Sequence, residues 1–218
     1  SEDDKVYLFD KDSSTPLWSY EPGENVHSVS ISADGEYIAA GSDDNKVYLF
    51  DKDSNAPLWS HTTGNDVHSV SISADGEYVV AGSYDNRVYL FDKDSGTPLW
   101  NYYTGDDVMS VAISADGEYI AAGTCNAPCS GSGYDDKVYL FDKDSNTPLW
   151  SYKTGDDVHT VAISADGEYI AAGGSFAGGS FDNKTYLFHK DSSTPLWSYT
   201  AGGTVHSVAI SADGEYIV

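Results

Sequence analysis

One segment of roughly 40 residues is repeated along this chain of 218 residues, and the repetition limits the folds that the chain can adopt. The sequence Lys-Val-Tyr-Leu-Phe, with small changes, begins at Lys5, Lys46, Arg87, Lys137 and Lys184. A tryptophan follows each copy, as Trp18, Trp59, Trp100, Trp150 and Trp197. The sequence Ser-Ala-Asp-Gly-Glu-Tyr begins at Ser32, Ser73, Ser114, Ser164 and Ser211. A period in this range is typical of solenoids, propellers and other arrays.

Each repeat has the pattern of four short strands. The first run, Val26–Ser32, alternates β-branched and polar residues, and three more runs follow after polar turns: Tyr37–Gly41, Lys46–Asp51 and Pro57–His61. The Asp-Gly pair between the first two runs predicts a hairpin turn in which both residues have positive φ. Proline at the start of the fourth run suits an outer edge strand, where a missing N–H removes no hydrogen bond from the sheet.

A sheet of four strands has two apolar faces and can bury both only against neighbouring sheets. Radial stacking around an axis achieves this. We therefore predict an all-β fold, a five-bladed β-propeller of four-stranded antiparallel blades. The small Ala and Ser side chains of the first two strands are expected near the axis. The Tyr, Phe and Trp side chains of the last two are expected in the wider outer gaps.

The repeat resembles two known propeller families. Val-x-x-Val-x-Ile-Ser-Ala-Asp-Gly, from Val26 to Gly35, and Gly-Ser-x-Asp-x-x-Val-x-Leu-Phe-Asp, from Gly41 to Asp51, resemble a WD-repeat. Phe-Asp stands where that family has Trp-Asp, and the family's Gly-His pair is missing. The segment from Asp92 to Trp100 resembles the tryptophan-docking motif of quinoprotein-like (PQQ-type) propellers. The resemblance covers essentially the whole chain and implies a propeller whose outer-strand Trp packs between adjacent blades.

The chain begins with the third and fourth strands of one repeat and ends with the first and second strands of another. We expect a single domain, 1–218, with blades at about 205–218 plus 1–20, 21–61, 62–103, 104–152 and 153–199. The two half-blades are expected to pair in a two-plus-two strand clasp between the N- and C-termini, because closure removes exposed sheet edges. A ring closed in this way is expected to be a monomer.

The composition excludes several partners. With 35 acidic and 11 basic residues, the net charge is −24, which repels phosphate backbones, so we expect no nucleic-acid partner. No run of 18 apolar residues is present, so no membrane insertion is expected. We also expect no enzyme and no cofactor. The predicted inner strands carry no acid pair for glycoside hydrolysis, and near-identical repeats do not provide distinct catalytic roles.

Cys125 and Cys129 are the only cysteines and lie four positions apart. They predict a disulfide that pins a loop, which implies an oxidising compartment and an extracellular or cell-surface location. Two reduced thiols are the alternative interpretation. A zinc site is not expected, because two thiolates supply only half of its ligands.

The variable parts of the repeats predict where a ligand binds. If the first strand runs from top to bottom, the loops before the first strand and after the second share a top face, and these loops vary most, with insertions at 125–133 and 175–180. Binding sites concentrate on such loops. One position at the upper end of the first strand is expected to surround the channel mouth and to bind a ligand: His27, His68, Met109, His159 and His206.

Imidazoles at a channel mouth suit a small ligand, an anion or a metal ion, although we assign no metal here. The alternative is that one ancestral His was copied with the repeat and only packs. Aromatic residues in the top loops are further predicted contacts: Tyr84, Tyr134, Phe176 and Phe181. The acids of turns such as 51–55 alternate as in a calcium-binding loop, but the Gly and the bidentate Glu of such a loop are absent. Self-capped turns with solvated acids are the other interpretation.

Together these patterns predict a non-catalytic binding or scaffold propeller that acts outside the cytoplasm and presents its top-face loops to a protein or other ligand. The alternative is a multivalent carbohydrate-binding, lectin-like propeller. Five-bladed lectins use sites between blades, and several weak equal sites would gain avidity.

The charge imbalance gives a first testable prediction. Since 35 acids outnumber 11 bases, charge repulsion destabilises the compact state, and added salt screens it. We expect the Tm, followed by circular dichroism at pH 7, to rise between ~10 mM and ~200 mM NaCl. A Tm that falls over this range would contradict the prediction.

Overall fold

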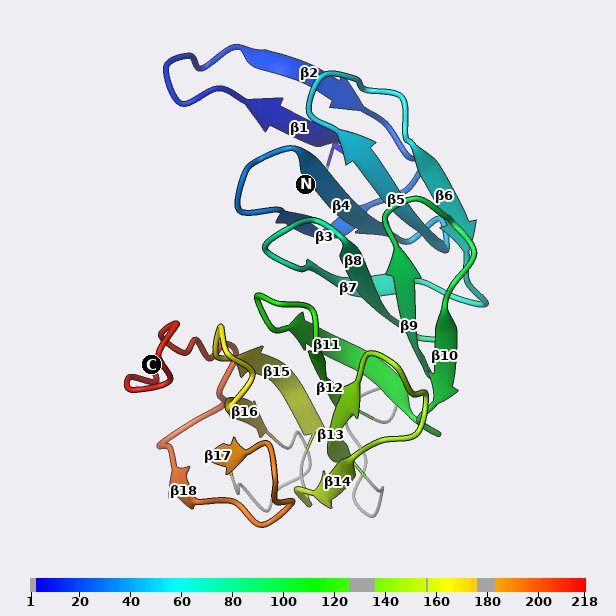
Figure 1. Cartoon of the computed structure of the whole chain (residues 1–218). Helices are drawn as coiled ribbons and strands as arrows, with labels where there is room; N and C mark the ends of the chain where they lie inside the picture. Colours follow the sequence, from blue (N-terminus) through cyan, green and yellow to red (C-terminus); the bar gives the residue numbers. More distant parts are fainter. Residues whose placement is uncertain (1–2, 126–135, 156, 176–182) are drawn as a thin grey trace.

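A computed structural model of the chain describes residues 3–125, 136–155, 157–175 and 183–218. Its 18 strands form four sheets of four strands and one sheet of two, which follow one another as blades along an arc (Figure 1). The described residues contain no helix, and therefore no helix long and apolar enough to cross a membrane. The predicted all-β, five-bladed propeller of antiparallel blades is confirmed.

The four complete blades each run from an inner to an outer strand. The first contains β3 (Val26–Ile31), β4 (Tyr37–Ser42), β5 (Lys46–Asp51) and β6 (Trp59–Thr62). The second contains β7 (Val67–Ile72), β8 (Tyr78–Ser83), β9 (Arg87–Asp92) and β10 (Trp100–Tyr103). The third contains β11 (Asp107–Ile113), β12 (Tyr119–Cys125), β13 (Lys137–Asp142) and β14 (Trp150–Lys153). The fourth contains β15 (Asp157–Ile163), β16 (Tyr169–Ser175), β17 (Lys184–His189) and β18 (Trp197–Thr200).

Antiparallel pairing fixes the two ends of every blade. Ala39 lies opposite Leu49, and Tyr48 lies opposite Ser60, so the strands alternate in direction. The Asp-Gly turns and the Asp-Lys-Asp-Ser turns therefore share one end, and the loops before the first strand share the other with the turns after the second. This is the division into bottom and top faces that the sequence predicts.

The Asp-Gly turn differs in detail from the prediction. Only its glycine has positive φ, at 77° in Gly35, whereas Asp34 is not among the positive-φ residues. The Asp34 carboxylate instead accepts hydrogen bonds from Ser32 Oγ at 2.6 Å and from the Glu36 amide at 3.0 Å. The Ser32 hydroxyl, followed by the Glu36 amide, lowers the pKa of Asp34. The aspartate is needed here as an acceptor rather than as a residue with unusual backbone.

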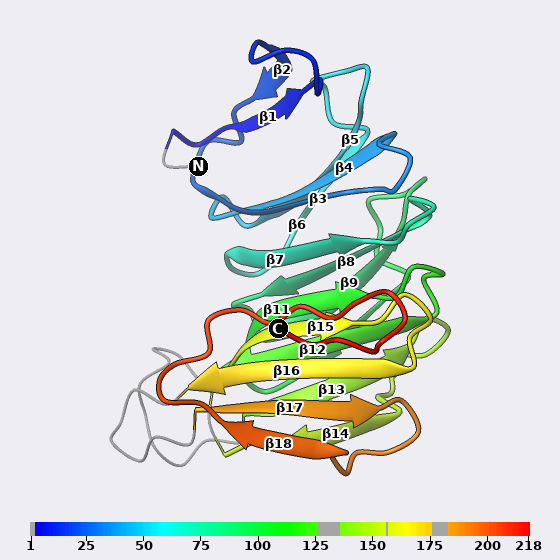
Figure 2. The same ribbon diagram turned by 90° about the vertical axis from the view of Figure 1, so that its left-hand side faces the viewer.

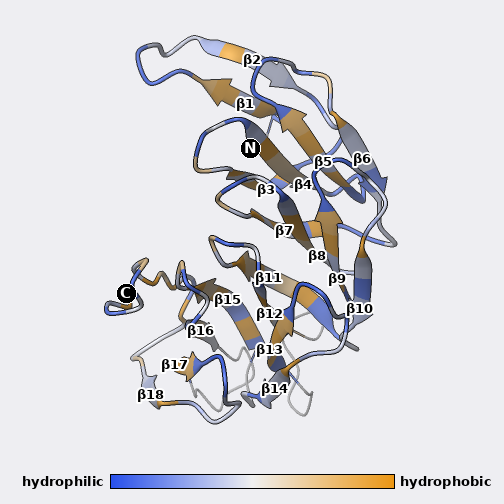
Figure 3. Cartoon of the chain, in the orientation of Figure 1, coloured by the Kyte–Doolittle hydropathy of each residue, from blue (hydrophilic) through white to orange (hydrophobic). Residues whose placement is uncertain are grey.

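The core lies between the blades. Hydrophobic residues follow the strands while the turns are hydrophilic (Figure 3). The third strand of each complete blade contributes a phenylalanine with no exposed surface, namely Phe50, Phe91, Phe141 and Phe188. The tryptophan of the outer strand covers the phenylalanine of the next blade, with ring centroids 5.1 Å apart for Trp59 and Phe91. The Ala residues predicted near the axis, such as Ala39 and Ala40, are fully buried.

Three hydrogen bonds recur where two blades meet. The Trp59 indole N–H donates to the Lys93 carbonyl at 2.8 Å. On the inner strands, the Val111 amide donates to Ser69 Oγ at 3.1 Å. On the bottom face, one alanine amide donates to the alanine carbonyl of the next blade, in a series with distances of 2.9–3.0 Å that runs through Ala33, Ala74, Ala115, Ala165 and Ala212. We call this set of three bonds the blade joint.

Two half-blades lie at the ends of the arc. The strands β1 (Val6–Phe9) and β2 (Pro16–Tyr20) form the two-stranded sheet, which packs against the first complete blade. Residues 205–218 pack against the fourth complete blade, where Ile210 and Ile217 form an isolated β-bridge.

The predicted clasp between these half-blades is not formed in the structure. Among the described residues, β1 pairs only with β2, and no pairing joins it to residues 205–218. Figures 1 and 2 show β1–β2 at one end of the arc and the C-terminal segment well away from it. The physical reason is that each half-blade is held by its own neighbouring blade, and the rotation from blade to blade leaves the arc open.

The blade joint yields a stability prediction. Trp100 donates its indole N–H to the Lys143 carbonyl at 2.7 Å, so Trp100→Phe leaves that buried carbonyl without this donor. We expect the free energy of unfolding in urea to fall by about 1–3 kcal/mol. The adjacent Leu99 is 53% exposed, and Leu99→Ala is expected to change it by less than about 0.5 kcal/mol. Equal effects of the two substitutions would contradict the importance of the joint.

Candidate functional site

The inner strands carry the predicted channel-mouth residues at β-bulges. The pairing of each inner strand with its neighbour skips one residue: between Val26 and Ser28, Val67 and Ser69, Val108 and Ser110, and Val158 and Thr160. The skipped residues are His27, His68, Met109 and His159. A bulge leaves its extra residue unpaired and redirects the side chain, and bulges are frequent next to binding sites. The repeated position is therefore defined by backbone geometry as well as by sequence.

Two of these histidines form an aromatic stack with a residue of a top loop. The rings of His27 and His68 stack with centroids 5.3 Å apart and an interplanar angle of 26°. On its other side, His68 stacks on Tyr84 at 5.1 Å and 17°. The stack thus extends from β3 to β7 and to the turn after β8. We call His27, His68, Tyr84 and Met109 the top rim.

Hydrogen bonds hold both histidines in place. His27 Nε2 lies 2.5 Å from Asp43 Oδ1. His68 Nδ1 lies 2.9 Å from the Met109 carbonyl oxygen, which makes this ring nitrogen the donor. Met109 therefore contributes to the rim through its backbone carbonyl. The other nitrogen of His68 is then an acceptor when the ring is neutral.

The surroundings of the rim resist positive charge on His68 and negative charge on Tyr84. Burial is the largest cause of the lowered pKa of His68, and the proximity of His27 adds to it, while the Met109 carbonyl, Asp43 and Asp66 oppose it. Burial and then the carboxylates of Asp107, Asp66 and Asp43 raise the pKa of Tyr84 to about 12. Both rings are therefore neutral at pH 7, next to a group of carboxylates.

The remaining predicted rim residues stand apart from the stack. Burial lowers the pKa of the half-buried His159, and His206 and His68 lower it further. His206 is exposed and lies in the C-terminal half-blade. Within the described ranges, neither ring joins the stack, and the arc does not bring the five positions into a closed ring. Of the predicted set, the structure brings together His27, His68, Met109 and Tyr84.

Sequence analysis missed the carboxylates near the rim. The strands β11 and β15 begin one residue earlier than predicted, so the inner strands do carry acids, Asp107 and Asp157, which are 9% and 2% exposed. Burial is the largest cause of the raised pKa of Asp107. Asp43 was also missed, although one signal was available: it occupies the repeat position that Tyr84 occupies in the next repeat.

Other predicted residues fall partly outside the described ranges. Tyr134, Phe176, Phe181 and Cys129 lie in segments that the structure does not describe. Cys125, the last residue of β12, is fully buried and disulfide-bonded.

The acidic turns on the bottom face use their own carboxylates. Asp51 Oδ1 accepts the Asp53 amide at 2.8 Å, and the equivalent bond recurs in the turns that begin at Asp10, Asp92 and Asp142. In the fourth complete blade, His189 Nδ1 accepts the Asp191 amide at 3.3 Å instead. These contacts match the self-capped interpretation. In the part of the chain that the structure describes, no group of three or more His, Cys, Asp or Glu side chains is placed to hold a metal ion.

Comparisons with known proteins agree with this architecture. The family model described as outer membrane protein assembly factor BamB matches residues 2–218. Among solved structures, a chain of the crystal structure of the mitotic checkpoint complex superposes with a TM-score of 0.77 and 18% sequence identity, over 98% of this chain and 66% of that chain. At this identity the likeness shows the fold alone, and this chain spans only that share of the other chain's length. Comparison with curated proteins gave no match.

The position of His68 in the rim predicts a pH effect. Its pKa in the folded state lies below the ordinary value of about 6.5 in the unfolded state, so the unfolded chain binds the proton more readily. The related stability is complete above that ordinary value and is lost as the pH falls toward the folded-state pKa. The urea midpoint of the wild type is therefore expected to fall more between pH 7.5 and pH 5 than that of His68→Gln.

His206→Gln serves as the matched control, because His206 is exposed and outside the stack. This variant is expected to follow the wild-type pH dependence. If His68→Gln does the same, His68 does not resist protonation in the folded protein. Side-chain NMR titration of the wild type gives a second measurement of the same quantity.

Proposed function

This chain belongs to the propeller family described as outer membrane protein assembly factor BamB, and on that premise we propose that it is a non-catalytic scaffold whose top face binds a partner protein. The observation that carries the proposal is the top rim, in which His27, His68 and Tyr84 form a stack of half-exposed rings beside carboxylates. Aromatic surfaces of this kind are enriched at the centres of protein interfaces.

The two faces of the propeller differ in a way that favours the top. On the bottom face, the same contacts recur in repeat after repeat, and lysines pair with the local acids, as Lys93 does with Glu77 at 3.0 Å and Asp94 at 3.5 Å. Those contacts stabilise the turns themselves. On the top face, the residues change from repeat to repeat, so that it offers a distinct surface at each blade. Recognition of one partner needs such differences.

The charge of the chain indicates the chemistry of the partner. The net charge is −24, and Asp43, Asp66 and Asp107 all lie close enough to the rim to affect the pKa of Tyr84. A segment with Lys or Arg side chains would meet both complementary charge and aromatic faces suited to cation–π contacts. We therefore propose a basic protein segment as the ligand. An extracellular or cell-surface location is part of the proposal, supported by the disulfide at Cys125.

A peptide-display selection tests this function. Random peptides displayed on phage are selected on the immobilised chain, and enriched sequences are expected to contain Lys or Arg and to bind less tightly at higher NaCl. Tyr84→Ala is expected to weaken a selected synthetic peptide about tenfold, because it removes an aromatic anchor. Asp66→Asn is expected to weaken it severalfold.

Asp94→Asn is the matched control, since it removes the same charge from the bottom face, where the Asp94 side chain is 80% exposed. It is expected to leave the affinity unchanged. Selected peptides that are insensitive to the top-face substitutions would contradict the proposal. A glycan array is run in parallel, and strong binding to one sugar class without peptide binding would favour the lectin alternative instead.

A further inference from the structure

The N-terminal half-blade is already positioned as part of a blade. Its Trp18 indole donates to the Lys52 carbonyl at 2.8 Å, as Trp59 does to Lys93 in the next joint. The rings of Trp18 and Phe50 lie 5.4 Å apart, close to the distance within complete blades. The sheet β1–β2 therefore has the position of the third and fourth strands of a blade whose first and second strands are absent.

The C-terminal half-blade is positioned in the complementary way. The Ala165 amide donates to the Ala212 carbonyl at 3.0 Å, continuing the alanine series of the bottom face. The Val208 amide donates to Thr160 Oγ1 at 3.2 Å, as inner strands do at the other joints. Residues 205–218 therefore have the position of the first and second strands of a blade whose outer strands are absent.

The N-terminal end exposes apolar residues that are buried everywhere else in the array. Phe9 is 52% exposed, whereas its repeat equivalents Phe50 and Phe91 have no exposed surface. Val29 is 59% exposed, against 5% for its equivalent Val70. Val29 also lines a groove with Ile31, Ile38 and the β1 residues Val6, Tyr7 and Leu8. This groove is the place where the missing strands would lie.

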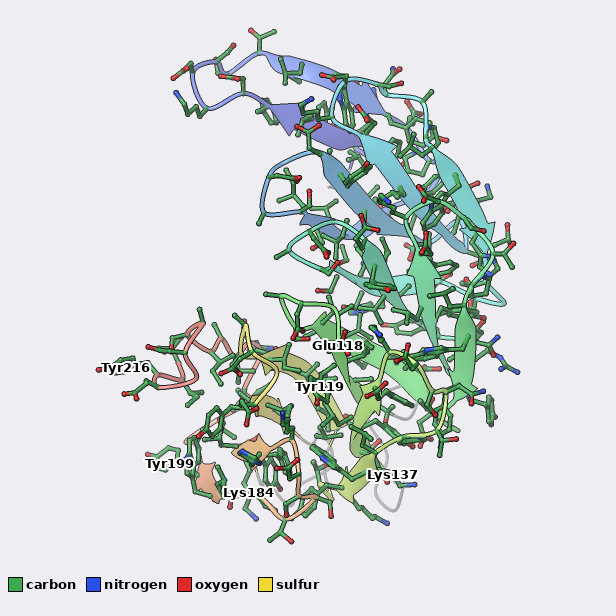
Figure 4. The ribbon with its side chains drawn as sticks, in the orientation of Figure 1. Glu118, Tyr119, Lys137, Lys184, Tyr199 and Tyr216 are labelled. Carbon is green, nitrogen blue, oxygen red and sulfur yellow. The ribbon has the colours of Figure 1, made fainter. Side chains whose placement is uncertain are left out.

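The C-terminal end exposes the matching set. Trp197 is 41% exposed and Tyr199 is 68% exposed, because no third and fourth strands follow to cover β18. Tyr216 is 73% exposed. Figure 4 shows Tyr199 and Tyr216 at the C-terminal end of the arc, far from β1 and β2. Each end of the chain thus exposes the apolar surface that the other end is built to cover.

A second copy can cover these surfaces without a change in the fold. Pairing the two half-blades within one chain would require a different rotation at each blade joint, where the same short hydrogen bonds recur. Pairing between two chains leaves every joint as it is. Edge strands with free backbone groups and apolar side chains are templates for such pairing.

We propose that residues 205–218 of one copy complete the half-blade β1–β2 of a second copy, so that chains associate head to tail through a shared blade. The repeat gives the register. Tyr37 lies opposite Asp51 and Ile38 opposite Phe50 in a complete blade, so Tyr216 of one copy pairs with Asp10 of the other, and Ile217 with Phe9. Trp197 then donates to the Lys11 carbonyl across the contact. The interface is heterologous and extends beyond a dimer unless the array closes.

Disulfide crosslinking in this register tests the proposal. Full-length Asp10→Cys and Tyr216→Cys chains are mixed and mildly oxidised, and a crosslinked dimer containing both chains is expected, since directly opposed residues of antiparallel strands lie within disulfide range. Ser14→Cys replaces Asp10→Cys as a control outside the register and is expected to give at least tenfold less crosslink. The double variant Asp10→Cys/Tyr216→Cys, oxidised at low concentration, reports closure within one chain.

Association without crosslinking is measured by sedimentation velocity over a hundredfold range of concentration. The mean mass is expected to rise with concentration, and Phe9→Asp is expected to abolish the rise. Leu17→Asp is the matched control, because Leu17 is 61% exposed and its equivalents Leu58 and Leu99 are exposed in complete blades too. A monomer at all concentrations, or an intrachain crosslink in the double variant, would overturn the proposal. Circular dichroism verifies that each variant is folded.

Discussion

The fold depends on one recurring contact, the blade joint. A single sheet of this repeat cannot bury its aromatic residues, and the joint supplies the missing face by bringing the outer Trp of one blade onto the Phe of the next. Hydrogen bonds at the inner strand, the bottom turn and the outer strand fix the relative position of the blades at three radii. The arc, the spacing of the inner strands and the position of the top rim all follow from that geometry.

The sequence predicted what is local and repeated. The strand Lys46–Asp51 was predicted to the residue, and the outer tryptophans were placed between blades by resemblance to PQQ-type propellers. Closure was harder to predict, because it depends on the rotation summed over all joints, which no single repeat encodes. The φ of Asp34 was missed for a different reason: a longer turn let its side chain accept two hydrogen bonds, so that only Gly35 needed positive φ.

For the candidate site, the alignment of repeats located the positions but not their contacts. His27 and His68 were identified because they occupy equivalent places, yet their stacking depends on a bulge that the sequence pattern does not reveal. Tyr84 was selected as an exposed loop aromatic, whereas it is half-buried against His68. Substitutions between repeats, such as Asp43 for Tyr84, carried the information that conservation of the motif concealed.

The alanine series of the bottom face has an evolutionary consequence. Ala33, Ala74, Ala115, Ala165 and Ala212 exchange only backbone groups, so each link is made by the same atoms whatever side chains surround it. A whole repeat gained or lost by recombination would therefore re-form the same links with its new neighbours. Blade number in such a lineage can change in single steps, while divergence accumulates in the loops at the opposite end of the strands.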